Sequence, residues 1–147
     1  MPPYSVEPVA EHAELRAALH ELVGRFIADY ERAANAHGLT LTQARVLGFA
    51  ASEPLPQRRL AERFGCDPSN ISLLVDRLVE RGLVERRPHP EDGRAKLVAA
   101  TGPGRELAVR CCRDREWLGP ALDGLAPEQL ETVRAALELL LSAAPRR

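Results

Sequence analysis

The chain has 147 residues, about one domain's worth; 45% of them are hydrophobic, 28% are charged, and the net charge is −1. This composition excludes a disordered chain, and no apolar run approaches the roughly 20 residues that span a bilayer. The N-terminal residues lack the basic and then apolar pattern of a signal peptide, so we expect a cytoplasmic protein. Three cysteines, an odd and sparse set, argue against a disulfide framework.

The charge is distributed unevenly along the chain. Residues 57–105 contain ten Lys/Arg and seven Asp/Glu, which gives this window a net charge of +3. Because the whole chain carries −1, the remaining residues carry −4. A basic centre between acidic ends fits a nucleic-acid-reading surface mounted on a scaffold.

The first half of the chain reads as three helices. Three prolines in residues 1–10 predict an extended arm. Apolar residues at three- or four-residue steps then predict a helix over 11–36, which Gly38 ends. Thr40 and Gln43 form a capping box that begins a second helix at 41–51. Pro54 and Pro56 break the chain, and Pro56 suits the first turn of a third helix at 56–64.

The second half reads as a helix, a hairpin and two more helices. Asp67 and Pro68 are a good N-cap and first residue for a helix over 68–81, which Gly82 closes. The runs 83–87 and 95–100 predict the two strands of a hairpin, joined by a turn rich in proline and glycine. Thr101 caps a helix at 102–118, Gly119-Pro120 should stop or kink it, and Pro127 opens a last helix to about Ala143.

The first and last helices each carry a long apolar stripe. The central unit of about 60 residues is too small to cover both stripes, and an exposed stripe would be an association site. A homodimer built from the N- and C-terminal helices solves this problem. Its two-fold symmetry would place two reading heads on one face of a DNA duplex.

The helix at 68–81 has a polar outer face suited to a major groove. Its apolar stripe sets the inward direction and leaves Ser69, Leu73, Asp76 and Arg77 pointing outward, with Asn70 and Ser72 on the flanks. Leu73 suits a thymine methyl, and Arg77 suits a phosphate or a guanine edge. A carboxylate would repel phosphate, so we expect Asp76 to orient an arginine. The alternative is an ordinary solvated helix face.

The hairpin adds a basic cluster directly after this helix: Arg86, Arg87, His89, Arg94 and Lys96. Arg94 at the tip is a sensible minor-groove probe, and the carboxylate of Asp92 can hold its guanidinium extended. The alternative is an ordinary charged β-turn, because Asp-Gly is a common turn dipeptide.

The segments LTQARVL, LAERFGCDPSNISLLVDRLVERGLVERR, PEDGRAKLVAAT and GREL resemble the MarR family of bacterial winged-helix regulators, from about Leu39 to Leu107. The resemblance implies a dimer that binds a pseudo-palindromic operator on double-stranded DNA, with Arg94 in the minor groove and Asp92 supporting it. It also implies release of DNA on binding a small aromatic or phenolic effector, or on cysteine oxidation. Leu73 departs from the family, which commonly has arginine there, and Gly119-Pro120 interrupts a helix that is often longer.

We therefore expect a mainly α fold with a small β-hairpin wing: one MarR-like domain over 1–147. Residues 39–101 form the winged helix-turn-helix, and 11–37 and 102–147 form the dimerisation helices. The expected function is a sequence-specific repressor relieved by a small-molecule ligand. The ligand pocket should lie where the dimerisation helices meet the reading head, with Arg16, His20 and Arg45 as candidates.

Other functions are weaker alternatives. A redox-responsive regulator would use Cys66 or the Cys111/Cys112 pair, although Cys111 has the spacing of a core residue. A winged-helix module for protein–protein contact, or a ligand-binding protein that has lost DNA binding, would share the fold. We expect no catalytic site and no cofactor, because no G-x-S-x-G, P-loop or Rossmann pattern is present. The four histidines do not have metal-ligand spacing, although His12 and His20 with a glutamate stay open as a metal site.

Overall fold

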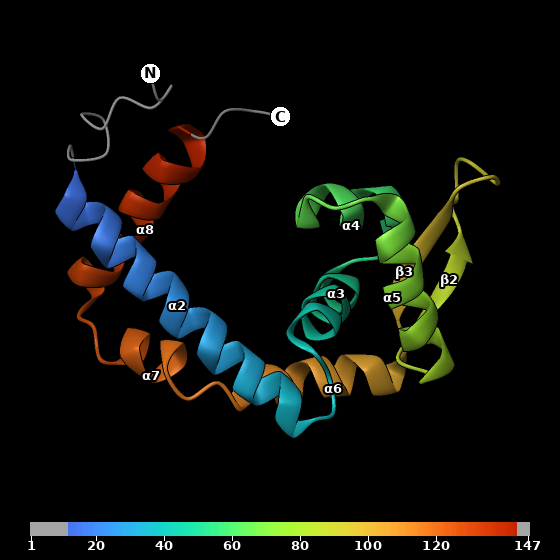
Figure 1. The fold of residues 1–147 in the computed structure, drawn as a ribbon, viewed down its shortest axis with the longest axis horizontal. Coiled ribbons are helices and arrows are strands. Elements are labelled where there is room, and N and C mark those ends of the chain that lie inside the picture. The colour runs from blue at the N-terminus through green and yellow to red at the C-terminus, as the bar shows by residue number, and fades with distance from the viewer. Residues whose placement is uncertain (1–11, 144–147) are drawn as a thin grey trace, which may run out of the picture. The chain divides into compact units, whose positions relative to one another are not determined.

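The computed structural model describes residues 12–143 (Figure 1), so the expected arm at residues 1–10 lies outside the described residues. The chain divides into two compact units, Met1–Arg115 and Glu116–Arg147. The first unit contains α2 (Ala13–Ala36), α3 (Leu41–Ser52), β1 (Leu55–Pro56), α4 (Gln57–Phe64), α5 (Pro68–Glu80), β2 (Val84–Pro88), β3 (Lys96–Ala100) and α6 (Gly102–Arg113). The second contains α7 (Leu118–Asp123) and α8 (Pro127–Ala143).

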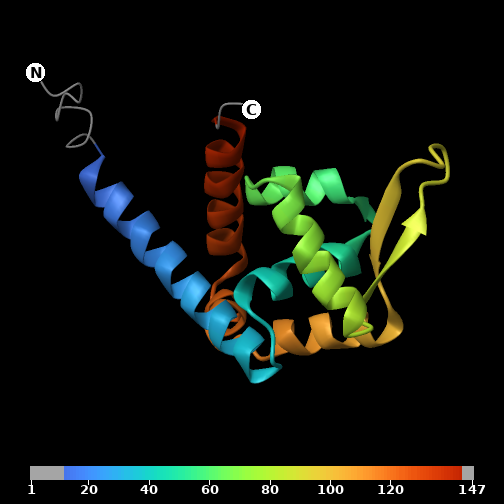
Figure 2. The same cartoon turned by 45° about the vertical axis from the view of Figure 1, so that its right-hand side comes forward.

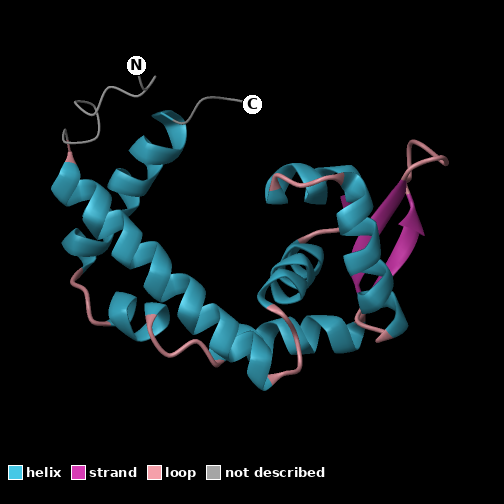
Figure 3. Ribbon diagram, in the orientation of Figure 1, coloured by secondary structure: helices cyan, strands magenta, loops and turns pink. Residues whose placement is uncertain are grey.

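The expected fold class is confirmed: the described chain is mainly helical, with a small antiparallel sheet and a hairpin wing (Figure 3). None of its described helices combines the length and the apolar character needed to cross a membrane.

Three helices begin where side chains satisfy their free backbone amides. The Thr40 hydroxyl accepts from the Gln43 amide at 3.2 Å, and the Gln43 side chain accepts from the Thr40 amide at 3.0 Å. Asp67 accepts from the Ser69 amide, and Thr101 accepts from the Gly104 amide at 3.1 Å. Each cap was expected, because short polar side chains replace the missing intrahelical acceptors at a helix start.

The sheet contains a third strand that the sequence interpretation missed. The strand order is β1-β3-β2, and the two-residue β1 pairs Leu55 with Val98 and Pro56 with Leu97. A strand of two residues is too short to show the alternation of apolar and polar residues that predicts a strand. The neighbouring prolines predicted only a break between two helices. Proline is tolerated on an edge strand because its missing donor leaves no partner unsatisfied there. Pro56 therefore ends β1, and α4 begins at Gln57.

The C-terminal boundary predicted for the helix at 102–118 is wrong: α6 ends at Arg113, and α7 begins at Leu118. Tertiary contacts hold the residue after α6, because the Asp114 carboxylate lies 2.6 Å from His37 and the Asp114 carbonyl accepts from Arg32 at 2.7 Å. Gly119-Pro120 does not end a helix but lies in the first turn of α7. A proline there removes no intrahelical hydrogen bond.

The core of the first unit joins the end of α2 with α3, α4, α5, α6 and the sheet. Its fully buried side chains include Leu47, Leu60, Ile71, Leu78 and Val98. Figure 2 shows α6 running beneath α3 and α5, and the hairpin extending beyond the helices. The core therefore fixes α5 and the base of the wing as one body.

A close backbone approach holds α6 against the end of α5. A Cβ on Gly104 would lie 1.8 Å from the Leu83 carbonyl oxygen, a backbone atom that cannot move aside cheaply. The Leu83 carbonyl also accepts from the Thr101 amide at 3.1 Å, and the Thr101 hydroxyl donates to the Gly82 carbonyl at 2.6 Å. Glycine at 104 is thus required by packing.

We predict that Gly104→Ala lowers the free energy of unfolding by about 3 kcal/mol or more, because the added methyl overlaps backbone. Urea unfolding followed by circular dichroism measures this. Gly102→Ala is the matched control, since nothing lies within 4 Å of a Cβ there, and it should change stability by less than about 1 kcal/mol. Equal stability of the two variants would contradict the packing argument.

Candidate nucleic-acid interface and ligand pocket

Helix α5 presents one face to the core and the opposite face to solvent. Ile71, Val75 and Leu78 are fully buried, whereas Leu73 is 61% exposed. Ser69, Asn70 and Arg77 are exposed and Ser72 is half-buried. The side chains that we expected to face outward therefore do so, and they form a polar surface with one apolar side chain at its centre.

The first turn of α5 is ordered by its cap. The Asp67 carboxylate accepts both the Ser69 amide at 2.8 Å and the Ser69 hydroxyl at 2.7 Å. These two hydrogen bonds hold the pKa of Asp67 below its usual value, with the hydroxyl contributing more. Since its single proton is given to Asp67, the Ser69 hydroxyl faces solvent as an acceptor.

An ion pair joins the wing to α5. The Arg86 guanidinium on β2 lies 2.7 Å from the Asp76 carboxylate and 3.5 Å from the Gln57 side-chain oxygen on α4. The expectation that Asp76 orients an arginine is confirmed. Arg86, which the sequence placed among the DNA contacts, makes polar contacts that tie β2 to α5 and α4.

The wing turn is closed by hydrogen bonds between nearby residues. The His89 amide donates to the Ala95 carbonyl at 3.0 Å, and the Asp92 side chain accepts from the Arg94 backbone amide at 3.0 Å. Asp92 thus orders the backbone that carries Arg94, whereas the sequence suggested a contact with the guanidinium. Arg94 and Lys96 are exposed, His89 accepts from the Glu91 amide, and Arg87 donates to Glu85 at 2.6 Å.

Helix α4 contributes basic side chains that the sequence interpretation did not single out. Leu60 and Ala61 are buried, and this leaves Arg58 and Arg59 exposed. In a helix-turn-helix, the helix before the recognition helix crosses the DNA backbone. The strong amphipathic pattern of QRRLAERF was the feature that could have revealed these positions.

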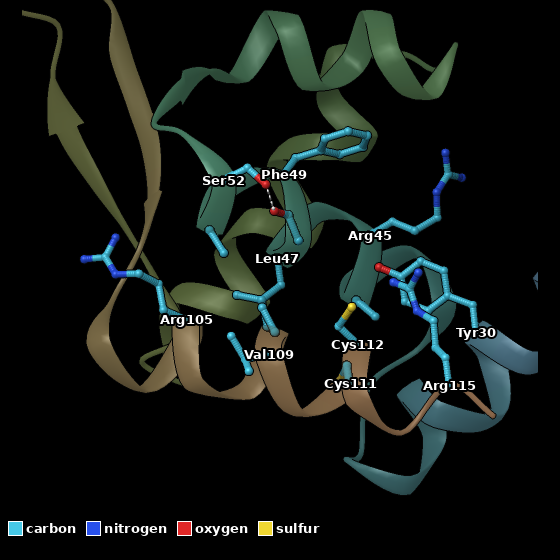
Figure 4. Close-up of a pocket in the computed structure, with 14 residues that line it drawn as sticks. Tyr30, Arg45, Leu47, Phe49, Ser52, Arg105, Val109, Cys111, Cys112 and Arg115 are labelled. Atoms are coloured by element: carbon cyan, nitrogen blue, oxygen red, sulfur yellow. Dashed lines mark hydrogen bonds between the residues drawn. The ribbon is translucent and has the colours of Figure 1, made fainter. Parts of the chain in front are cut away.

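A pocket of about 490 Å³ lies between α3 and α6 and reaches Tyr30 on α2 (Figure 4). It lies where α2 and α6 meet the reading head, the place at which the sequence predicted a ligand pocket. Arg45 lines the pocket, but Arg16 and His20 do not. They lie 14 and 10 residues before Tyr30 on α2, which places them about 21 and 15 Å along the helix from it.

Most of the pocket wall is apolar or basic, and none of the lining residues within 12–143 carries a carboxylate. At one end the Arg115 guanidinium lies 3.6 Å from the centroid of the Tyr30 ring, and the buried Arg115 Nε has no hydrogen-bond partner among the described residues. Burial raises the pKa of Tyr30, despite the opposing effect of the Arg115 charge. Such a site suits a ligand with an apolar body and an acceptor oxygen.

The three cysteines lie in different environments. Cys111 is buried and burial raises the pKa of its thiol, whereas Cys112 is exposed at the pocket and Cys66 is half-buried against the core. The core position expected for Cys111 is confirmed. No group of three His, Cys, Asp or Glu side chains in residues 12–143 is arranged to hold a metal ion.

We predict that iodoacetamide modifies Cys112 in the native protein at neutral pH while Cys111 stays unmodified. The thiolate is the nucleophile, and a raised pKa together with burial keeps Cys111 protonated and covered. Mass spectrometry of the peptide containing both residues measures the label. Cys112→Ser should remove it and the matched Cys111→Ser should not. Native labelling that survives in Cys112→Ser would contradict the assignment, and both thiols should react in denaturant.

Comparison with known proteins agrees with this geometry. The MarR family model matches residues 37–95. An HTH-type transcriptional regulator of Mycobacterium bovis is 33% identical over 106 residues, which cover 71% of this chain and 74% of that protein. A MarR family regulator from Rhodococcus sp. RHA1 is 30% identical with a TM-score of 0.68, covering 90% of this chain and 96% of its own.

CouR from Rhodococcus jostii RHA1, whose crystal structure contains p-coumaroyl-CoA, is 31% identical with a TM-score of 0.70. The match covers 88% of this chain and 93% of CouR. Fold, motif order and sequence identity agree: the chain belongs to the MarR family of winged helix-turn-helix regulators, DNA-binding proteins that control transcription and are not enzymes.

Proposed function

We propose that the protein is a homodimeric repressor that binds a pseudo-palindromic operator and releases it when a small ligand occupies the α3–α6 pocket. Residues 1–147 act as one functional domain, with the winged helix-turn-helix at 39–101 and dimerisation segments at 11–37 and 102–147. The observation that carries the proposal is that the polar face of α5 and the basic wing are joined by an ion pair and share one buried core.

Helix α5 enters the major groove and the wing reaches the adjacent minor groove. Ser69, Asn70, Ser72 and Leu73 read base edges, and Arg77 contacts a phosphate or a guanine. Arg94 enters the minor groove from a turn that Asp92 orders. Arg87, His89 and Lys96 contact phosphates, together with Arg58 and Arg59 on α4. Arg86, which Asp76 holds beside α5, contacts DNA from this position.

Dimerisation is supported by apolar faces that each unit leaves exposed. In α8, Leu130, Val133, Leu137 and Leu140 recur at three- or four-residue steps. In α2, Leu15, Leu22, Val23 and Ile27 are exposed as well. Monomeric proteins rarely leave such stripes in water, so a second copy of the chain is the simplest cover.

The pocket supports an aromatic or phenolic effector. CouR binds p-coumaroyl-CoA, a ligand with a phenolic ring. The pocket here offers apolar walls, the Tyr30 ring and basic side chains. An effector lowers operator affinity only by the ratio of its affinities for the free and the DNA-bound conformations.

We predict that Arg94→Ala weakens binding to DNA from the intergenic region beside its own gene by roughly 1–3 kcal/mol, because a minor-groove contact is lost. Fluorescence anisotropy at several salt concentrations measures the affinity and its salt slope. The slope of log K against log salt should be near −0.9 for each phosphate contacted.

Arg25→Ala is the matched control for Arg94→Ala. Arg25 is an exposed arginine on α2 that pairs with Glu21 at 2.6 Å, far from α5 and the wing in sequence. Its loss should leave DNA affinity unchanged. If both variants bind as tightly as the parent protein, the assignment of the wing to DNA fails. Binding without salt dependence would favour a protein-interaction module instead.

We predict that Leu137→Asp raises the dissociation constant of the dimer by at least about tenfold, because a charge enters the apolar stripe of α8. Analytical ultracentrifugation over a concentration series measures this. Leu139→Asp is the matched control: Leu139 lies on the opposite side of α8 and is 70% exposed, against 46% for Leu137. Equal effects of both variants would argue against dimerisation through this stripe.

A further inference from the structure

Four side chains on α3 and α4 form a reciprocal stack that we call the α3–α4 clasp: Arg45, Phe49, Arg63 and Phe64. The rings of Phe49 and Phe64 meet edge to face, with centroids 5.9 Å apart and planes at 81°. The Arg45 guanidinium from α3 lies 4.4 Å from the centroid of the Phe64 ring on α4. The Arg63 guanidinium from α4 lies 4.7 Å from the centroid of the Phe49 ring on α3.

One side of the clasp belongs to the pocket. Arg45 and Phe49 both line it, and Figure 4 shows them on the α3 side. An occupant that contacts the guanidinium of Arg45 or the ring of Phe49 therefore competes with the contacts that these groups make to Phe64 and Arg63.

The other side of the clasp leads to the recognition helix. Phe64 is the last residue of α4, and Gly65 follows it in the left-handed conformation with φ 60°. Asp67, the N-cap of α5, comes three residues after Phe64. A displacement of Phe64 is thus passed along a short, sharply turned segment to the cap that orders Ser69.

The physical character of the clasp suits a contact that rearranges. Phe49 and Phe64 are only partly buried and pack at the margin of the core, whereas Leu47 and Leu60 on the same helices are fully buried. Leu47 and Leu60 belong to the buried core, which does not depend on the clasp. Cation–π contacts at partly exposed sites are individually weak, so a bound ligand can outcompete them.

We propose that the α3–α4 clasp couples the pocket to the DNA-reading face: an occupant of the pocket displaces Arg45 or Phe49, moves Phe64 and disturbs the first turn of α5. Phe64 acts as a positioning residue that contacts neither ligand nor DNA. This inference rests on the proposed ligand-release function and names the route by which release occurs. Such a claim requires a measured coupling, which a double-mutant cycle supplies.

The experiment uses a side chain as the occupant, so that it needs no identified ligand. Val109 lines the pocket from α6 and is half exposed, which makes Val109→Trp a tolerable way to fill the space. DNA affinity is measured for the parent protein, Val109→Trp, Phe64→Leu and the double variant, on the intergenic duplex. Hydrogen exchange of the peptide covering residues 65–74 is measured on the same four proteins without DNA.

We expect Val109→Trp to weaken DNA binding about tenfold in the parent background and less than twofold in the Phe64→Leu background, within the range usual for coupled sites. Val109→Trp should raise the hydrogen-exchange rate of residues 65–74 in the parent background but not in the Phe64→Leu background. Phe64→Tyr keeps the ring and should restore the tenfold effect, which a purely structural role of Phe64 would not require.

Phe26→Leu is the matched control, because Phe26 has similar surroundings on α2. Its ring meets Tyr30 edge to face with centroids 6.0 Å apart, and the Arg115 guanidinium lies 5.7 Å from its centroid. Among the ring contacts of residues 12–143, none leads from Phe26 to α5, so the tenfold effect of Val109→Trp should persist in this background. Circular dichroism confirms that each variant is folded before its affinity is compared.

Two outcomes overturn the inference. In one, Val109→Trp weakens DNA binding by the same factor in the parent and in the Phe64→Leu background. The coupling between pocket and DNA would then not pass through Phe64. In the other, Val109→Trp changes neither DNA affinity nor exchange at residues 65–74. If the parent protein fails to bind the duplex at all, the proposed function fails, and the exchange measurement still decides whether the clasp transmits occupancy to α5.

Discussion

The apolar stripe of α5 anchors the helix in the core through Ile71, Val75 and Leu78, and this burial fixes which side chains can meet a partner. Apolar burial at three positions contributes several kcal/mol, so the helix cannot rotate without losing a large part of the marginal stability of such a domain. The outward face of Ser69, Asn70 and Leu73 is therefore a consequence of packing. The core determines which way this face points, and the polar contacts of α5 only adjust the side chains on it.

Polar contacts then relate the wing to that helix. The Arg86–Asp76 pair is half exposed, and such pairs contribute little to stability. The ion pair instead fixes the position of β2 relative to α5. The Gln57 side chain on α4 contacts the same guanidinium. The hydrogen bond from the Arg94 amide to Asp92 orders the tip in the same way. These contacts make one surface from a helix and a hairpin.

The pocket is lined by side chains that also make contacts between helices. Arg115 stacks on Tyr30 with an unsatisfied buried Nε, and Arg45 is shared between the pocket and Phe64. Asp114, the neighbour of Arg115, holds the end of α2 through His37 and Arg32. A ligand at this place meets the contacts that join α2, α3, α4 and α6.

Local chemistry in the sequence was enough to predict the helix starts at Thr40, Asp67 and Thr101, the outward face of α5 and the hairpin, because caps, periodicity and turn residues act over a few positions. Only the tertiary structure decided the rest. Strand β1 exists because Leu55 meets Val98, and α6 ends where Asp114 meets residues of α2. The pocket brings Tyr30 together with Arg115, which lie 85 positions apart, so no local pattern could have predicted that these two side chains line it.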